Sequence, residues 1–203
     1  METNHDTLTR SQADRRHRVI LAAMTLGANG GYDAVQMRDV ATTANVALGT
    51  IYRYFASKDH LLAATLVEWV SDLQTRLAQH PPKGETSADR VVEVVMRATR
   101  SMERKPKLTA ALLTAVSSPD PAVSTCQVQI TRIMGELLSA PMTDVDPRRR
   151  AGVVQVLSHV WFSTLLGWVN GWENVGSVSE ELELATRLLL ENSTPAGWRA
   201  REL

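Results

Sequence analysis

The sequence has a single cysteine, Cys126, among its 203 residues. One cysteine excludes an intramolecular disulfide and a cysteine-rich zinc site, and we expect Cys126 to be a small, semi-buried hydrophobic residue. No apolar run approaches the ~20 residues of a membrane span, and the first residues lack the apolar segment of a signal peptide. We therefore expect a cytoplasmic protein with no membrane partner.

Signatures of catalysis are also missing from the sequence. The five histidines have no metal-ligand spacing, and no glycine-rich phosphate loop follows a strand. The paired carboxylates Glu180 and Glu181 fall at a predicted helix start, where negative charge complements the helix dipole. We expect a protein that is not an enzyme and that has no cofactor and no metal, with an enzyme as the less favoured alternative.

Charge is balanced overall but unevenly distributed along the chain. Residues 10–58 contain seven basic and three acidic residues, a net charge of +4, so the rest of the chain carries −4. A locally basic segment in a neutral protein is typical of a DNA-binding region joined to a body with another role.

Apolar residues recur every three or four positions, and no long stretch alternates with period two. This pattern predicts an all-α protein of about nine helices. The first helix is predicted to end among the glycines of residues 27–31, and Ser57 to cap a long helix. Asp146 and Pro147 predict the start of another long helix, which we expect to reach about Trp172.

Two short helices, predicted at residues 37–44 and 48–55, are separated by about three residues. That spacing is typical of a helix-turn-helix, whose second helix enters the major groove. Asn45 falls at the turn and tolerates a left-handed backbone. Tyrosine hydroxyls and Lys58 suit phosphate oxygens, and Thr50 and Arg53 suit base edges. We expect Ile51 and Phe55 to be core residues, and Tyr52 or Tyr54 to lie at the surface.

The stretch from about Arg15 to Leu62 resembles the DNA-binding domain of the TetR family of bacterial repressors, most specifically in the string GTIYRYFASK of residues 49–58. Asn45 stands where the family often has glycine. The resemblance implies DNA contacts from Gly49, Thr50, Tyr52, Tyr54 and Lys58, and from Arg38, Thr42 and Thr43 on the preceding helix. With Leu48 and Arg53, these make up the predicted DNA-binding residues.

A narrower resemblance is to the repressors of cholesterol and sterol degradation in actinobacteria. It rests on GGY at residues 30–32, AVQMR at 34–38, VW at 160–161 and LLGW at 165–168. Members of that branch respond to steroid-derived coenzyme A thioesters, and the resemblance implies an effector of this kind.

Three tryptophans, at positions 161, 168 and 172, are spaced to share one face of the predicted helix that begins at Pro147. They are interpreted as ordinary core or as a dimer interface, and the remaining alternative is that Trp161 or Trp168 borders the ligand pocket. In the TetR family the last two helices form a four-helix interface with the partner. The residues predicted for the dimer interface are Trp168, Trp172, Leu182, Ala185 and Leu189.

A ligand pocket is predicted among the middle helices, where methionines and leucines offer adaptable apolar walls. The absence of a cluster of convergent polar groups favours a large apolar effector. The residues predicted for the pocket are Met96, Met102, Leu112, Leu113, Met134, Trp161 and Leu165.

We therefore expect a ligand-responsive repressor that binds palindromic double-stranded operator DNA as a homodimer. A large apolar effector, such as an acyl- or steroid-CoA thioester, is expected to release it from genes of lipid or sterol catabolism. The predicted domains are residues 10–56 for DNA binding, 57–192 for ligand binding and dimerisation, and 193–203 as a tail. The alternatives are a TetR-type regulator of a drug-efflux pump or another pathway, and an effector-blind DNA-binding protein.

Overall fold

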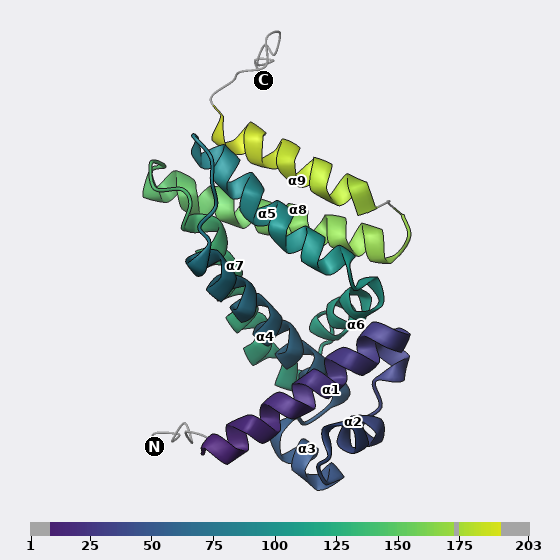
Figure 1. Ribbon diagram of the computed structural model, residues 1–203. Coiled ribbons are helices and arrows are strands. Elements are labelled where there is room, and N and C mark those ends of the chain that lie inside the picture. Colours follow the sequence, from purple (N-terminus) through teal and green to yellow (C-terminus); the bar gives the residue numbers. More distant parts are fainter. Residues whose placement is uncertain (1–8, 173–174, 192–203) are drawn as a thin grey trace. The chain divides into compact units, whose positions relative to one another are not determined.

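The computed structural model describes residues 9–172 and 175–191, which form nine α-helices and no strand (Figure 1). This confirms the prediction of an all-α fold, and the predicted tail at 193–203 lies outside the described residues. The helices are α1 (Arg10–Ala34), α2 (Met37–Ala44), α3 (Leu48–Tyr54), α4 (Lys58–Gln79), α5 (Ser87–Glu103), α6 (Pro106–Val116), α7 (Pro121–Ser139), α8 (Pro147–Val169) and α9 (Val175–Leu190).

The chain divides into two compact units. Unit 1 comprises residues 1–72 and 104–131, and unit 2 comprises residues 73–103 and 132–203. Helices α4 and α7 therefore contribute residues to both units. The domain boundary expected after residue 56 stays a prediction.

Unit 1 is organised around α1, which packs along α6 and against α2 and α3. Gly27 is buried, and a Cβ atom there would lie 2.9 Å from Leu108 Cδ1 of α6. The predicted end among the glycines corresponds to a break in the helical backbone at Gly31 (φ 74°, ψ −158°), after which helical structure resumes and reaches Ala34. Gly27 lacks a side chain so that α6 can approach α1, and only Gly31 interrupts the helical backbone.

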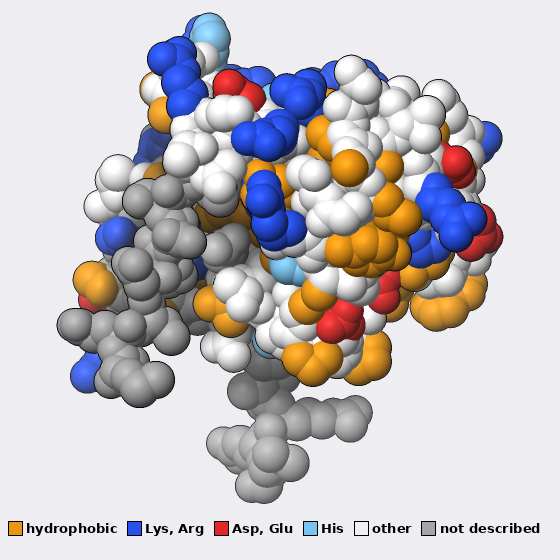
Figure 2. All heavy atoms as spheres, turned by 90° about the horizontal axis from the view of Figure 1, so that it is seen from below, with side chains coloured by type: hydrophobic (Ala, Val, Ile, Leu, Met, Phe, Trp, Pro, Cys, Tyr) orange, Lys and Arg blue, Asp and Glu red, His pale blue; other side chains and the backbone are white. Residues whose placement is uncertain are grey.

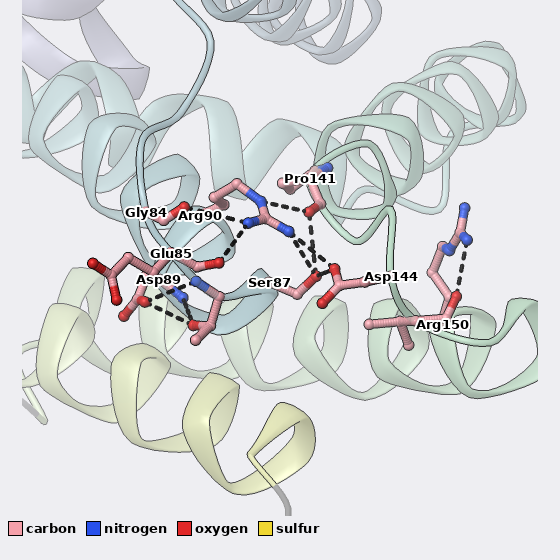
Figure 3. Close-up of polar contacts among 10 residues, drawn as sticks. Gly84, Glu85, Ser87, Asp89, Arg90, Pro141, Asp144 and Arg150 are labelled. Atoms are coloured by element: carbon pink, nitrogen blue, oxygen red, sulfur yellow. Dashed lines mark hydrogen bonds and ion pairs between the residues drawn. The ribbon is translucent and has the colours of Figure 1, made fainter.

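Unit 2 contains α5 and α8, each packed against α9. Figure 3 shows the guanidinium of Arg90, near the start of α5, pointing toward the turns on either side of it. Its Nε donates to the carbonyl of Pro141 at 3.0 Å, and its Nη2 contacts Asp144 Oδ1 at 2.9 Å. The Ser87 hydroxyl also donates to Asp144. These bonds tie the first turn of α5 to the segment that leads into α8.

The two ends of α8 test the sequence prediction in opposite ways. Asp146 caps the start as predicted, and its side chain accepts from the backbone N–H groups of Arg148 and Arg149. The end comes earlier than expected, because Gly171 takes a left-handed conformation (φ 73°) and the Trp172 N–H donates to the Gly167 carbonyl at 2.9 Å. Trp172 therefore lies beyond the helix, exposed, and does not share a helical face with the other two tryptophans.

Among the described residues, α8 is the one helix long and apolar enough to cross a membrane by length and composition alone. The sequence analysis did not expect such a run. Four of its apolar residues instead form a buried stripe within the protein, namely Val153, Leu157, Trp161 and Leu165. Burial of this stripe accounts for part of the apolar composition of the helix, whereas Val156 and Phe162 of the same helix are exposed.

Candidate nucleic-acid interface

The turn between α2 and α3 has the geometry of a helix-turn-helix. Asn45 ends α2 in a left-handed conformation (φ 52°, ψ 56°), which confirms the conformation predicted for it. The N–H groups of Asn45 and Val46 donate back to α2, the latter to the Ala41 carbonyl at 3.0 Å. The chain therefore reverses direction at this turn, and α3 begins after only three intervening residues.

The inner sides of the two helices are held by apolar residues. Val40 and Ala41 of α2 are buried, as are Ile51 of α3 and Phe55, which follows α3. Burial of Ile51 and Phe55 confirms that both are core residues. Because α3 has only seven residues, this packing rather than intrinsic helix stability fixes its orientation.

The outer side of α3 is open to solvent. A Cβ atom added to Gly49 would meet no atom within 4 Å, so no packing within the protein explains why glycine stands here. Tyr52 is exposed, as predicted for at least one of the two tyrosines. Of the other predicted DNA-binding residues, Arg38, Thr42, Thr43 and Arg53 are exposed, and Leu48, Thr50, Tyr54 and Lys58 are half-buried.

A shallow hollow in this surface brings together three of the predicted residues, Arg38, Thr42 and Leu48. Asn45 and Ala47 of the turn complete its rim. Figure 2, a view from below Figure 1, shows several Lys and Arg side chains on this face, with fewer Asp and Glu side chains among them. Such a surface suits the phosphate backbone of a duplex.

Arg53 and Lys58 are both held by aromatic rings. The Arg53 guanidinium lies 5.2 Å from the Tyr54 ring centroid and donates to the Tyr54 hydroxyl at 3.2 Å. Lys58 Nζ lies 3.6 Å from the ring centroid of Tyr32 and 3.3 Å from the Tyr32 carbonyl oxygen. These contacts restrict the positions of the two cations.

Tyr32 was not predicted as a site residue, yet it links the end of α1 to the start of α4. Its hydroxyl donates to Asp59 Oδ1 at 2.5 Å, next to Lys58 in the chain. Burial, followed by this hydrogen bond to a carboxylate, raises the pKa of Tyr32 to about 12. The Tyr32 hydroxyl therefore stays protonated and donates its hydrogen bond to the Asp59 carboxylate, next to Lys58 in the chain.

Two arginines of α1 contact residues in and next to the helix-turn-helix. Arg16 pairs with Glu68 of α4 at 2.6 Å, and its guanidinium lies 5.4 Å from the Phe55 ring centroid. Arg18 Nε donates to the carbonyl of Ala44 in the last turn of α2 at 3.4 Å. Much of the positive charge of α1 thus supports the fold of unit 1.

The start of α4 is capped by Ser57, as predicted, whose Oγ accepts from the His60 N–H at 3.0 Å. The same hydroxyl donates to Asp120 Oδ2 at 2.5 Å, and Asp120 Oδ1 accepts from the N–H of Ala122 in α7. The hydrogen bond from Ser57 is the main reason that the pKa of Asp120 is lowered. One carboxylate thus bridges the first turns of α4 and α7 within unit 1.

His60 makes this junction sensitive to acid. Burial lowers the pKa of His60, and its Nδ1 accepts from the backbone N–H of Ala56, which requires the neutral ring. The unfolded chain therefore binds a proton more readily than the folded protein below about pH 6.5. We expect the free energy of unfolding to fall as the pH is lowered from about 7.5 to about 5.5.

Thermal unfolding at fixed protein concentration across this pH range measures the effect. His60→Asn keeps an acceptor for the Ala56 N–H but has no titrating ring, so part of the pH dependence should disappear. His80→Asn, at an exposed position after α4, should keep the whole dependence. Identical pH profiles for wild type and His60→Asn would contradict the assignment.

The residues predicted for the dimer interface are distributed differently from the expectation. Leu182 is fully buried within its own chain, whereas Trp168, Ala185 and Leu189 are half-buried. Exposed apolar side chains of α8 and α9 also lie at four other positions, namely Val156, Phe162, Leu184 and Leu188. Their exposure could not be deduced from the sequence, because helical periodicity alone does not show which apolar stripe another helix of the same chain covers.

The residues predicted for the pocket fall in both units. Leu112 and Leu113 are buried in unit 1, and the remaining five belong to unit 2. In unit 2, Trp161 and Leu165 are buried, while Met96, Met102 and Met134 are half-buried. The pocket stays a prediction. Cys126 is buried as expected, which raises the pKa of its thiol.

Two family models match the sequence. The model for the bacterial regulatory proteins of the tetR family matches residues 19–65, which include the helix-turn-helix. The model for the tetracyclin repressor-like C-terminal domain matches residues 84–189.

Comparison with individual proteins gives the same relationship over most of the chain. The HTH-type transcriptional repressor KstR of Rhodococcus jostii is 37% identical over 186 residues, which cover 91% of this chain and 87% of that protein. A TetR transcriptional regulator from Rhodococcus sp. RHA1 superposes with a TM-score of 0.81 at 28% identity, over 90% of this chain and 99% of that one. Thermus thermophilus FadR in complex with lauroyl-CoA superposes with a TM-score of 0.71 at 21% identity, over 93% and 97%.

Proposed function

Because this chain belongs to the TetR family of bacterial regulatory proteins, we propose that it is a cytoplasmic, ligand-controlled repressor that binds operator DNA as a homodimer. Its relatives are transcriptional repressors, which confirms the expectation of a regulator and not an enzyme. The proposal adds the mode of DNA binding, the assembly and the class of effector.

The proposal that the protein binds DNA through α3 rests on the residues of the outer surface of that helix. Gly49 leaves room for the duplex, while Tyr52 and Arg53 reach out from a helix anchored by Ile51. In this arrangement α3 lies in the major groove, and the tyrosine hydroxyls and Lys58 donate to phosphates. Arg53 and Thr50 are the side chains proposed to read base edges.

A homodimer follows from the requirements of a palindromic operator. Two copies of α3 must reach successive major grooves, about 34–36 Å apart along the duplex. The exposed apolar side chains of α8 and α9 supply the surface that a second copy would cover.

The effector is proposed to be a large apolar acyl group carried on coenzyme A, either a fatty acyl or a steroid acyl group. The similarity to KstR supports the steroid alternative through the sterol-repressor branch that the sequence resembles. The fold similarity to FadR with bound lauroyl-CoA supports the fatty-acyl alternative. Genes of lipid or sterol catabolism are the targets in either case.

Gel-shift titration on the promoter DNA beside the gene for this protein tests the proposal. Binding should weaken steeply with salt, with a log–log slope of about −0.9 for each phosphate neutralised. A steroid-CoA thioester or lauroyl-CoA should release the DNA, and operator DNA should weaken binding of that thioester by the same factor. Calorimetry that gives equal thioester affinity with and without operator would rule out this form of control. Release by cationic drugs alone would favour an efflux regulator.

A further inference from the structure

Unit 2 contains buried polar groups that the protein itself leaves unpaired. Within the part of the chain that the structure describes, three such atoms lack a hydrogen-bond partner, namely Thr99 Oγ1, Arg150 Nε and Trp161 Nε1. Arg150 still donates through Nη2 to the Val145 carbonyl, whereas the indole N–H is the whole polar capacity of Trp161. Thr99 is only 1% exposed and Trp161 only 3% exposed.

Such unpaired groups are unusual, because proteins satisfy nearly all of their buried donors and acceptors. Two other buried threonine hydroxyls of unit 2 bond back to their own helix, as helical threonines commonly do. Thr164 donates to the Trp161 carbonyl at 3.0 Å, and Thr186 donates to the Leu182 carbonyl at 2.7 Å. Thr99 makes no such bond, so its hydroxyl is available to a bound molecule, as is the indole of Trp161.

Thr99 lies on α5 and Trp161 lies on α8, and both helices begin beside the C-terminal end of α9. Arg149, in the first turn of α8, donates to the carbonyl of Leu189 at the end of α9. Asp89, in the first turn of α5, pairs with Arg187 of α9 at 3.3 Å. Both α5 and α8 pack along α9 (Figure 1), so both run antiparallel to it. The hydrogen bond between Ser87 and Asp144 joins their starting ends directly (Figure 3).

Because of this alignment, Thr99 and Trp161 lie at similar distances from the starts of their helices, measured along the helix axes. At 1.5 Å per residue, Thr99 lies about 15 Å along α5 from Asp89, and Trp161 lies about 18 Å along α8 from Arg149. Each belongs to a buried stripe with a spacing of four residues. Val91 and Val95 precede Thr99 on its stripe, and Val153 and Leu157 precede Trp161. Both polar groups therefore continue a buried stripe whose preceding members are apolar.

We propose that Trp161 and Thr99 are the polar anchors of the effector site, and that the effector carries a carbonyl oxygen within its apolar body. The Trp161 indole donates to that oxygen, and the Thr99 hydroxyl donates to the same oxygen or to a neighbouring one. The inference rests on the proposed function and adds the chemical feature that the site selects. Since a buried donor without a partner is costly, an equally apolar molecule without the carbonyl binds less tightly.

Two matched pairs of probes test the inference by calorimetry on the full-length protein, and they distinguish two sources of the carbonyl. In the first pair, lauroyl-CoA is compared with S-dodecyl-CoA, in which a methylene replaces the thioester carbonyl. In the second, a steroid ketone is compared with its parent hydrocarbon. We expect the carbonyl-bearing member of at least one pair to bind about tenfold more tightly, the size of one net hydrogen bond.

Substitutions locate the donor of that hydrogen bond. Trp161→Phe should remove the preference for the carbonyl, and Thr99→Val should reduce it. Trp69→Phe, which removes a half-buried indole from α4 instead, should leave the preference unchanged. Trp161→Phe also replaces a buried ring by a smaller one, which costs packing free energy, so thermal unfolding must show that the variant folds. If Trp161→Phe does not fold, an unchanged preference in Thr99→Val overturns the inference.

The outcomes separate this inference from the proposed function. Equal affinities within both pairs overturn the anchors, as does a preference that survives both Trp161→Phe and Thr99→Val. Failure of both pairs to bind at all also overturns them. If a carbonyl probe binds through Trp161 but does not release operator DNA, the anchors stand and the proposed control fails. Release without any carbonyl preference contradicts only the anchors.

Discussion

Gly49→Val is expected to abolish operator binding while leaving the fold and the assembly of the protein intact. No atom of the protein lies within 4 Å of a Cβ at this position, so valine meets no steric conflict in the free protein. In the complex the added methyl groups occupy space that the duplex needs. With each misfit contact costing about 1–3 kcal/mol in each of two half-sites, operator affinity should fall by about thirtyfold or more.

Gel shift against fluorescently labelled operator measures this loss, with Gly49→Ala as a smaller step in the same direction. Ala78→Val adds branched bulk at an exposed position of α4, away from the helix-turn-helix, and should bind operator like wild type. Circular dichroism and thermal unfolding should be nearly unchanged for all three variants. Wild-type affinity in Gly49→Val would show that α3 does not lie against DNA as proposed.

Local features of the helix-turn-helix were predictable from the sequence because their causes are local. The left-handed Asn45, the cap at Ser57 and the burial of Ile51 and Phe55 each depend on a few neighbouring residues. Backbone preference, capping chemistry and helical periodicity decide these features within one or two turns.

Features that depend on distant residues were missed. The contact of Lys58 with Tyr32 joins residues 26 positions apart, and the bond from Ser57 to Asp120 joins residues 63 apart. Gly27 looked like a helix end because glycine is a common terminator, whereas its role is set by Leu108 of α6. The prediction that the three tryptophans share one helical face was wrong for Trp172, because the left-handed Gly171 ends α8 before that residue. The spacing of residues in the sequence does not reveal which partner an element packs against.

Phe162→Glu combined with Leu188→Glu is expected to convert the protein from a dimer to a monomer. Phe162 of α8 is 44% exposed and Leu188 of α9 is 61% exposed, so neither side chain is needed to fill the core of its own chain. Between two copies, however, each glutamate would be buried opposite an apolar surface without a partner. Burial of an unpaired charge costs several kcal/mol, so the dissociation constant should rise by about three orders of magnitude or more.

Val128→Glu provides the matched control for this double variant. Val128 is 69% exposed, but it lies on α7 rather than on the last two helices, so the added charge should leave the dimer intact. Sedimentation velocity at micromolar concentration measures the mass, and circular dichroism checks that both variants keep their helices. Because two linked copies of α3 are proposed to bind a palindromic operator, the monomer should also lose most of its operator affinity. A double variant that sediments as a dimer would place the interface on another surface.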